Sequence, residues 1–152
     1  MSQGQRPRGS PARRFTARAT PAAEGTWESP RPRTLVIESN TAVADSVASA
    51  LRIAGHLVET ASIRADALAL MKRHRYDLVV SDLRMPALGG PSLYEELARH
   101  SPRTPPAVIF ITQSAFSPEY SKFLMDVGIP LLVKPVSPTA LWEAAARLLA
   151  TR

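Results

Sequence analysis

Four polar side chains stand where apolar runs of this chain end, and together they could hold an anion or a metal ion. The residues are Glu38, Asp82, Thr112 and Lys134, and the runs before them are 34–37, 78–80, 107–111 and 131–133. Uninterrupted apolar runs are typical of parallel strands covered on both faces. The carboxyl ends of such strands face the crevice where an open α/β sheet binds ligands. The sequence therefore predicts acids, a hydroxyl and an ammonium group at one edge of a sheet.

Asp82 carries the strongest of these signals. It lies in the segment DLVVSDLRMPALGG, residues 77–90, where one proline and two glycines after the acid prevent a strand or helix from continuing. An isolated aspartate before a proline-containing loop is most often a turn former. Here the strand before Asp82, and Thr112 and Lys134 at matching strand ends, favour a residue that reacts or holds a cation.

With these strand ends the chain resembles the receiver domain of bacterial response regulators, the CheY-like family, over about residues 33–151. The resemblance rests on SDLRMPALGG around Asp82, on Thr112 and on VKPV around Lys134. It implies that Asp82 accepts a phosphoryl group from a histidine kinase or histidine phosphotransfer protein. It also implies that Thr112 bonds and Lys134 pairs with that group, and that the domain is a regulatory phosphoacceptor and not an enzyme, apart from its own phosphotransfer and dephosphorylation.

The resemblance further implies Mg²⁺, held by acids at the end of the first strand, by Asp82 and by the backbone carbonyl of Arg84. The family usually has two adjacent acids after that strand, whereas this chain has Glu38 followed by Ser39. Because Mg²⁺ is usually bound through only one or two carboxylates with several waters, a lost carboxylate is a large part of the site. We therefore expect weak Mg²⁺ binding and slow phosphorylation, unless Glu38, one methylene longer than aspartate, reaches inward.

Two further positions depart from the family pattern. An aromatic residue three before the lysine normally swings inward on phosphorylation, but this chain has Leu131, which cannot reproduce a ring movement. Gln113 stands where the family prefers a small residue, and it should hinder small phosphodonors. These departures support an alternative, a degenerate receiver that binds a protein partner without being phosphorylated.

Five strands alternate with five helices in the predicted order. The strands are 34–37, 57–60, 78–80, 107–111 and 131–133; the helices are 40–54 (capped by Asn40 and stopped by Gly55), 63–74, 91–100, one opening at Ser117-Pro118 and one at Ser137-Pro138. Alternation with short connections predicts a doubly wound, five-stranded parallel sheet with helices on both faces. We expect the flavodoxin-like strand order 2-1-3-4-5, in which Glu38 and Asp82 converge.

Composition divides the chain into two parts. Residues 1–33 contain seven Arg and two Glu, a net charge of +5, whereas residues 34–152 contain twelve Lys or Arg and eleven acids, a net charge of +1. The first part has five Pro and few aliphatic residues, so it cannot bury enough surface to offset the entropy of ordering. We predict a disordered basic Pro/Arg-rich tail at 1–32 and a receiver domain at 33–152.

The simplest interpretation of the tail is a solvated extension. Its composition is also that of an organellar transit peptide, and Arg13-Arg14 could contact nucleic acid or anionic lipid. The chain has no apolar core for a signal peptide and no run of about 18 apolar residues for a membrane span. It also has no cysteine. We therefore expect a cytoplasmic protein.

Other classes of site lack their motifs. The chain has no GxGxxG, GK[ST] or GxSxG sequence, and ESNTA at 38–42 is a poor phosphate-cradling loop. His56, His74 and His100 lack metal-ligand spacing, so we expect them at the surface or at helix ends. We expect no output domain after residue 152 and no DNA-binding module within the first 33 residues. We expect regulation through contact with a downstream protein, on a surface that exposes Tyr120 or Trp142.

Overall fold

Five parallel strands form the centre of the protein, whose computed structural model describes residues 30–114 and 118–152. The strands are β3 (Arg33–Ile37), β4 (Leu57–Ala61), β5 (Leu78–Asp82), β6 (Ala107–Thr112) and β7 (Leu131–Val133). Their order across the sheet is β4-β3-β5-β6-β7, and every neighbouring pair is parallel. The predicted order 2-1-3-4-5 is confirmed. Because β3 and β5 are neighbours, the residues that follow them lie side by side.

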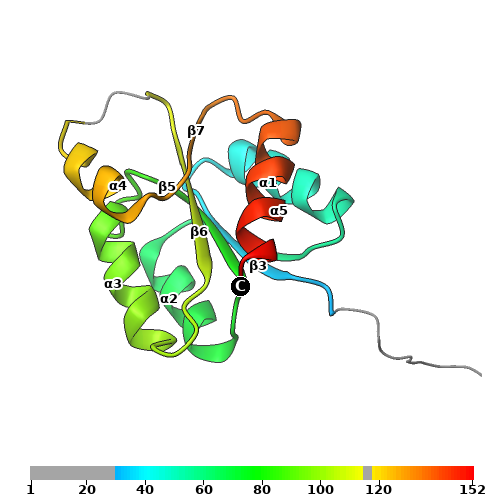
Figure 1. The fold of residues 1–152 in the computed structure, drawn as a ribbon, viewed down its shortest axis with the longest axis horizontal. Helices are drawn as coiled ribbons and strands as arrows, with labels where there is room; N and C mark the ends of the chain where they lie inside the picture. Colours follow the sequence, from blue (N-terminus) through cyan, green and yellow to red (C-terminus); the bar gives the residue numbers. More distant parts are fainter. Residues whose placement is uncertain (1–29, 115–117) are drawn as a thin grey trace, which may run out of the picture. The chain divides into compact units, whose positions relative to one another are not determined.

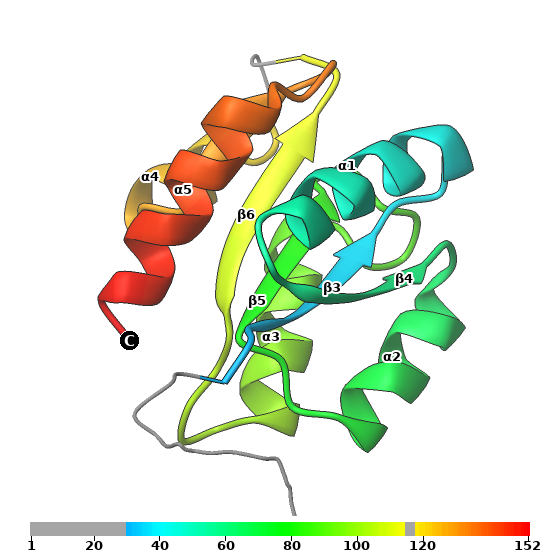
Figure 2. The ribbon, with the colours of Figure 1, turned by 90° about the vertical axis from the view of Figure 1, so that its right-hand side faces the viewer.

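Helices cover both faces of the sheet (Figure 1). They are α1 (Thr41–Ile53), α2 (Arg64–Arg73), α3 (Gly90–His100), α4 (Ser121–Val127) and α5 (Pro138–Ala150). Figure 2 shows α1 on one side of the strands and α2 and α3 on the other. The apolar contacts agree, because α1 and α5 share one buried cluster while α2 and α3 contribute to a second one, against which α4 packs.

Alternate strand residues supply the two clusters. Leu35, Val79 and Phe110 point toward α2 and α3, whereas Val36 and Val80 point toward α1 and α5, and all five are fully buried. Full burial of one such side chain contributes about 1.5–3 kcal/mol, so the central strands are held firmly from both faces. The carboxyl ends of β3, β5 and β6 are therefore fixed positions from which polar side chains can be presented.

Two of the predicted helix starts are confirmed in detail. Asn40 Oδ1 accepts a hydrogen bond from the Val43 amide at 3.1 Å, and Ser137 Oγ accepts one from the Ala140 amide at 3.2 Å. Each cap satisfies a backbone donor that the first turn of a helix leaves without a partner. Gly55, the predicted stop of α1, has a φ of 98° one residue after the C-cap.

The predicted start of the fourth helix is wrong. Pro118 lies in a turn, and α4 begins three residues later at Ser121, with Tyr120 at its N-cap and no side-chain capping bond. Ser117, the predicted cap, lies outside the described residues, as do residues 1–29, which include nearly all of the predicted tail. Within the described ranges no helix has the length and hydropathy of a membrane span.

Three ring-bearing residues differ from their predicted exposure. Trp142 is half-buried against α1, where its indole N–H donates to the Ala50 carbonyl at 2.7 Å. Tyr120 is half-buried against the apolar cluster under α2 and α3. His56 is buried rather than at the surface, and its Nδ1 lies 2.8 Å from Thr34 Oγ1. His74 and His100 do stand at the ends of α2 and α3.

Candidate functional site

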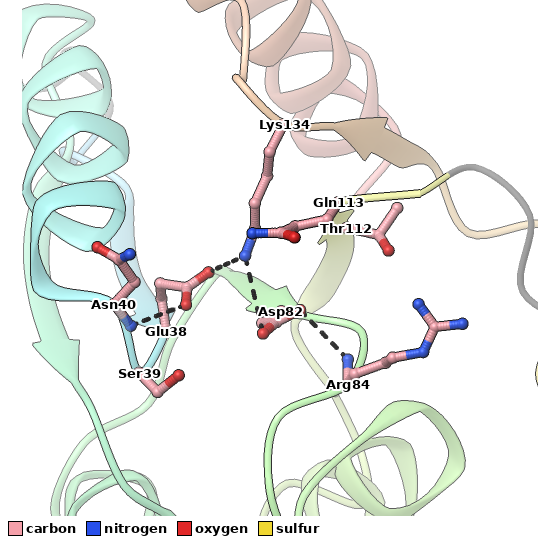
Figure 3. Close-up of a pocket in the computed structure, with 8 residues that line it drawn as sticks. All are labelled: Glu38, Ser39, Asn40, Asp82, Arg84, Thr112, Gln113 and Lys134. Carbon is pink, nitrogen blue, oxygen red and sulfur yellow. Dashed lines mark hydrogen bonds and ion pairs between the residues drawn. The ribbon is translucent and has the colours of Figure 1, made fainter.

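A polar cavity of about 390 Å³ opens at the carboxyl edge of the sheet. Figure 3 shows the residues that line it, which are Glu38, Ser39, Asn40, Asp82, Arg84, Thr112, Gln113 and Lys134. They come from the ends of β3, β5, β6 and β7 and from the loops that follow. This edge is the predicted location of the site.

The backbone of the sheet fixes where each of these side chains begins. Glu38 directly follows β3, and its amide continues the ladder by donating to the Ala61 carbonyl at 3.0 Å. Asp82 is the last residue of β5. Lys134 directly follows β7, and its amide donates to the Thr112 carbonyl at 2.7 Å. The peptide bond between Lys134 and Pro135 is cis.

Lys134 lies between two carboxylates. Its Nζ is 2.6 Å from Glu38 Oε1 and 3.8 Å from Asp82 Oδ2. The side chains of Glu38, Lys134 and Asp82 are only 1%, 11% and 17% exposed. The predicted convergence of these three residues is confirmed, and we call them the acid–lysine cluster. Because charges out of water need a partner, Lys134 offsets much of the repulsion between the two acids.

Glu38 is held in place from both of its oxygens. Oε2 accepts a hydrogen bond from the Asn40 amide at 2.9 Å, while the buried Oε1 makes no hydrogen bond of good geometry despite its short distance to Lys134 Nζ. We take the contact with Lys134 to be an ion pair that leaves a lone pair of Oε1 unused. Glu38 therefore does reach inward, and it already has a cation beside it.

Asp82 is linked by its neighbour Arg84 to the beginning of α4. The Arg84 amide donates to Asp82 Oδ1 at 3.3 Å, and the Arg84 guanidinium donates to Glu119 Oε1 at 2.8 Å. This hydrogen bond raises the pKa of Arg84 and lowers the pKa of Glu119, so both groups are charged at neutral pH. Both side chains are exposed, and ion pairs in water are weak.

Thr112 and Leu131, two of the predicted phosphate-binding or switch residues, have partners other than Asp82 in this structure. Thr112 is buried and lines the cavity, but its hydroxyl donates to the Ser114 carbonyl at 3.0 Å. Leu131 lies away from the cavity lining and packs, half-buried, against the apolar cluster under α2 and α3. Gln113 is exposed at the cavity wall. A bond from Thr112 to a group on Asp82 therefore requires its hydroxyl to turn.

The oxygen donors of the cavity fit Mg²⁺ incompletely. Asp82, the unused lone pair of Glu38 and the Arg84 carbonyl are oxygen ligands of the right type, but exposed Ser39 supplies a neutral hydroxyl where the family has a carboxylate. Among residues 30–114 and 118–152, no group of three or more His, Cys, Asp or Glu side chains is placed to hold a metal ion. The described residues therefore offer only an incomplete set of Mg²⁺ ligands at this edge.

Sequence reasoning missed two contributors to this region. The Asn40 amide holds Glu38, and Glu119 holds Arg84 across 35 positions. No local pattern marks Glu119.

The order of the strands, the helices on both faces and a lysine beside an aspartate at the carboxyl edge define a CheY-like signalling domain. The family described as "Response regulator receiver domain" matches residues 34–146, and the chain belongs to it. It is therefore a receiver domain of two-component signalling, from a family that is regulatory rather than enzymatic, that has kinases as partners and that typically binds Mg²⁺.

Individual relatives agree with this assignment. A response regulator receiver protein of Anaeromyxobacter sp. (strain Fw109-5) is 38% identical over 105 residues, which are 69% of this chain and 43% of that protein. The transcriptional regulatory protein GlrR of Escherichia coli (strain K12) is 34% identical over 90 residues, which are 59% of this chain and 20% of GlrR. The chain thus spans less than half the length of these two relatives.

Solved structures show the same fold. The chemotaxis response regulator CheY4 of Vibrio cholerae is 27% identical with a TM-score of 0.66, and the match covers 78% of this chain and 99% of CheY4. A CheY-like receiver domain protein of Methanospirillum hungatei JF-1 is 29% identical with a TM-score of 0.67, covering 80% and 96% of the two chains.

Proposed function

We propose that Asp82 accepts a phosphoryl group from a histidine kinase or a histidine phosphotransfer protein, and that the domain signals by contact with a downstream protein. One observation carries this proposal: Lys134 Nζ lies 3.8 Å from Asp82 Oδ2 in an open polar cavity. A dianion that forms on Asp82 would have an ammonium group beside it before the reaction begins, which is the compensation that phosphoryl transfer needs.

The reaction exchanges one phosphorus bond for another. A carboxylate oxygen of Asp82 forms a bond to phosphorus as the bond between phosphorus and the donor's imidazole nitrogen breaks, and that nitrogen keeps the electron pair. Lys134 then moves from Glu38 toward the new phosphoryl oxygens, and Thr112 turns its hydroxyl from the Ser114 carbonyl to donate to them. Each movement exchanges one polar partner for a more highly charged one.

Mg²⁺ would be held by Asp82, by the Arg84 carbonyl and by Glu38, and it would neutralise charge on the transferred group. Since Ser39 replaces a carboxylate and Glu38 is already paired with Lys134, the affinity for Mg²⁺ and the rate of phosphorylation are both low in this proposal. Leu131 makes any coupled movement of β7 small, because no ring has to change its position.

A second function is favoured by the same substitutions. A degenerate receiver would use the fold as a protein-binding module without phosphorylation. Ser39, Leu131 and the ion pair between Glu38 and Lys134 are consistent with that function. The two functions differ in whether Asp82 is modified, so the same experiment separates them.

The remaining parts of the proposal concern organisation and location. Residues 33–152 act as the receiver, residues 1–32 act as a disordered basic extension, and the protein works in the cytoplasm. The receiver itself does not bind DNA, because its charge is nearly balanced. Retention on a DNA-cellulose column is compared between the full chain and residues 30–152. This comparison separates a nucleic-acid contact of the tail from one of the receiver.

The test of the phosphoacceptor is intact mass. The full chain and its Asp82→Ala variant are incubated with acetyl phosphate and excess Mg²⁺, and then with an autophosphorylated histidine kinase, because Gln113 narrows the entry for small donors. We expect the wild type to gain the mass of one phosphoryl group and the variant to gain none. If neither donor modifies the wild type, Asp82 is not a phosphoacceptor and the protein-binding function stands in its place.

A further inference from the structure

The loop after β5 touches the beginning of α4 at two adjacent places. At one, the exposed Arg84 guanidinium is 2.8 Å from Glu119 Oε1. At the other, the ring of Tyr120 lies directly over Gly89 and Gly90. We call these two interactions the α4 contact. Arg84 and Gly89 belong to the loop that follows Asp82, and Gly90 is the first residue of α3, so the contact joins the candidate phosphoacceptor to the turn before α4.

The Tyr120 ring depends on the two glycines. A Cβ atom on Gly89 would lie 2.8 Å from Tyr120 Oη and 2.8 Å from the Leu83 carbonyl oxygen, and one on Gly90 would lie 3.1 Å from two ring carbons of Tyr120. Distances below 3.0 Å essentially never occur for real Cβ atoms. The absence of side chains at these positions therefore lets the ring approach the loop, and a shift of the loop must move the ring.

The helix on the other side of the contact is weakly held. α4 has only seven residues, none of them is fully buried, and Met125 is 83% exposed. A helix this short is marginal without tertiary support. Tyr120 stands at its N-cap and gives no side-chain cap, so contacts of Tyr120 and Glu119 contribute much of what fixes the first turn.

The Arg84 guanidinium has a stronger potential partner than Glu119. Arg84 lines the cavity that contains Asp82, and its own amide already bonds to Asp82 Oδ1. A phosphoryl group adds a charge of about −1.5 to −2 and three acceptor oxygens, and guanidinium binds such groups through two parallel hydrogen bonds. An exposed pair of single charges such as Arg84 and Glu119 is readily exchanged for that arrangement.

We propose that the Arg84 guanidinium leaves Glu119 to bind the phosphoryl group on Asp82, and that this exchange releases the beginning of α4. The inference rests on the proposed function of Asp82 and adds the route by which its state reaches the surface. It assigns to Arg84, Glu119 and Tyr120 the coupling that aliphatic Leu131 cannot perform by a ring movement.

The test uses beryllofluoride, which binds beside an aspartate as a phosphoryl analogue, in excess Mg²⁺. Its affinity is measured by fluorine NMR for the wild-type full chain and for Arg84→Gln, Glu119→Gln and the double variant. Loss of charge-assisted hydrogen bonds should weaken binding by about tenfold in Arg84→Gln. Freeing the guanidinium should strengthen binding by about threefold in Glu119→Gln.

The double variant separates the exchange from a general effect of charge. If Glu119 acts only through Arg84, its replacement changes nothing once Arg84 is glutamine. Asp126→Asn is the matched control, because Asp126 lies on α4 shortly after Glu119, pairs with Lys122 at 3.0 Å and is not among the residues that line the cavity. It should leave the affinity unchanged.

Amide chemical shifts of 121–127 give a second readout. In the wild type we expect these signals to move on adding beryllofluoride, and in unliganded Glu119→Gln we expect them to lie part of the way toward the bound positions. A threefold gain in Glu119→Gln that persists in the Arg84→Gln background, or α4 signals that move equally in all variants, would overturn the exchange while leaving phosphorylation of Asp82 intact. If beryllofluoride binds no form of the protein, the exchange is overturned, while transfer from a histidine kinase to Asp82 decides the proposed function separately.

Discussion

The two halves of the site differ in how firmly they are held. The acid–lysine cluster consists of side chains that are at most 17% exposed, and it stands on three strand ends of the sheet. The α4 contact consists of an exposed ion pair and a half-buried ring at the beginning of a seven-residue helix. The first half is built before any phosphoryl group arrives, whereas the second can change its partners.

This difference indicates which part does chemistry and which part transmits it. Groups that stabilise charge in a reaction work best when they are already in position. Elements that signal must have two arrangements of similar free energy, which weakly held surface contacts provide. The predictions below perturb the fixed half, then the loop that joins the halves, and finally a site at the opposite end of the sheet.

The largest effect is expected from Lys134→Met. The substitution leaves Glu38 buried without its cation beside a second carboxylate, and breaking a buried pair in this way costs about 3 kcal/mol of unfolding free energy. Urea denaturation measures the loss. The double variant Glu38→Gln/Lys134→Met should recover most of it, because no uncompensated charge remains at Glu38; an equally unstable double variant would mean that packing rather than charge holds this half.

Ser39→Asp should strengthen Mg²⁺ binding by about tenfold. A unit charge pair at about 4 Å and an effective dielectric constant of 20 gains roughly 4 kcal/mol, most of which desolvation offsets. Titration calorimetry measures the affinity, and Ser39→Asn controls for size without charge. Submillimolar Mg²⁺ affinity in the wild type would contradict the weak site, and equal affinities of the aspartate and asparagine variants would exclude Ser39 as the missing ligand position.

Ala87→Gly should stabilise the loop between the two halves. Ala87 has a φ of 62°, where its Cβ is strained, and its carbonyl accepts from Arg64 Nη1 at 2.7 Å. Glycine relieves that strain but gives the unfolded chain more conformational freedom. The net effect should raise the unfolding free energy by about 0.5–1 kcal/mol. Ala69→Gly, in the interior of α2, should instead lower it by about 1 kcal/mol. A loss at both positions would mean that Ala87 is not strained.

The smallest effect concerns His56, which lies at the end of the sheet opposite the site. Burial lowers the pKa of His56 below its usual 6.5, and the Asp77 carboxylate opposes this in part. As the pH falls below about 6.5 the unfolded chain takes up the proton first, so the unfolding free energy should decrease, while above that pH His56 contributes no pH dependence. Denaturation at pH 7.5 and pH 5.5 tests this, and the decrease should be smaller in His56→Gln. An unchanged decrease would assign it to other groups.

Much of the fold and the positions of the cluster could be predicted from the sequence. Apolar runs that end on polar residues mark buried parallel strands. Pro86, Gly89 and Gly90 after Asp82 end a strand in any tertiary context. Asn40 and Ser137 act on amides three residues away, so their caps are local properties.

The remaining features depend on tertiary contacts that no local pattern encodes. Flexible side chains can bind several partners, and the folded structure decides which one they bind. Examples are Lys134 between two acids, the Thr112 hydroxyl turned toward Ser114, and Arg84 paired with Glu119. The start of α4 was mispredicted because tertiary packing, more than a proline signal, decides whether so short a helix forms.

The most direct measurement is the position of the modified residue after transfer from a phosphorylated histidine kinase. Borohydride reduction converts an aspartyl phosphate to homoserine, which peptide mass spectrometry locates. We predict homoserine at position 82 alone in the wild type and at no position in Asp82→Asn. Homoserine at another carboxylate, or none in the wild type despite a phosphorylated kinase, would contradict the account.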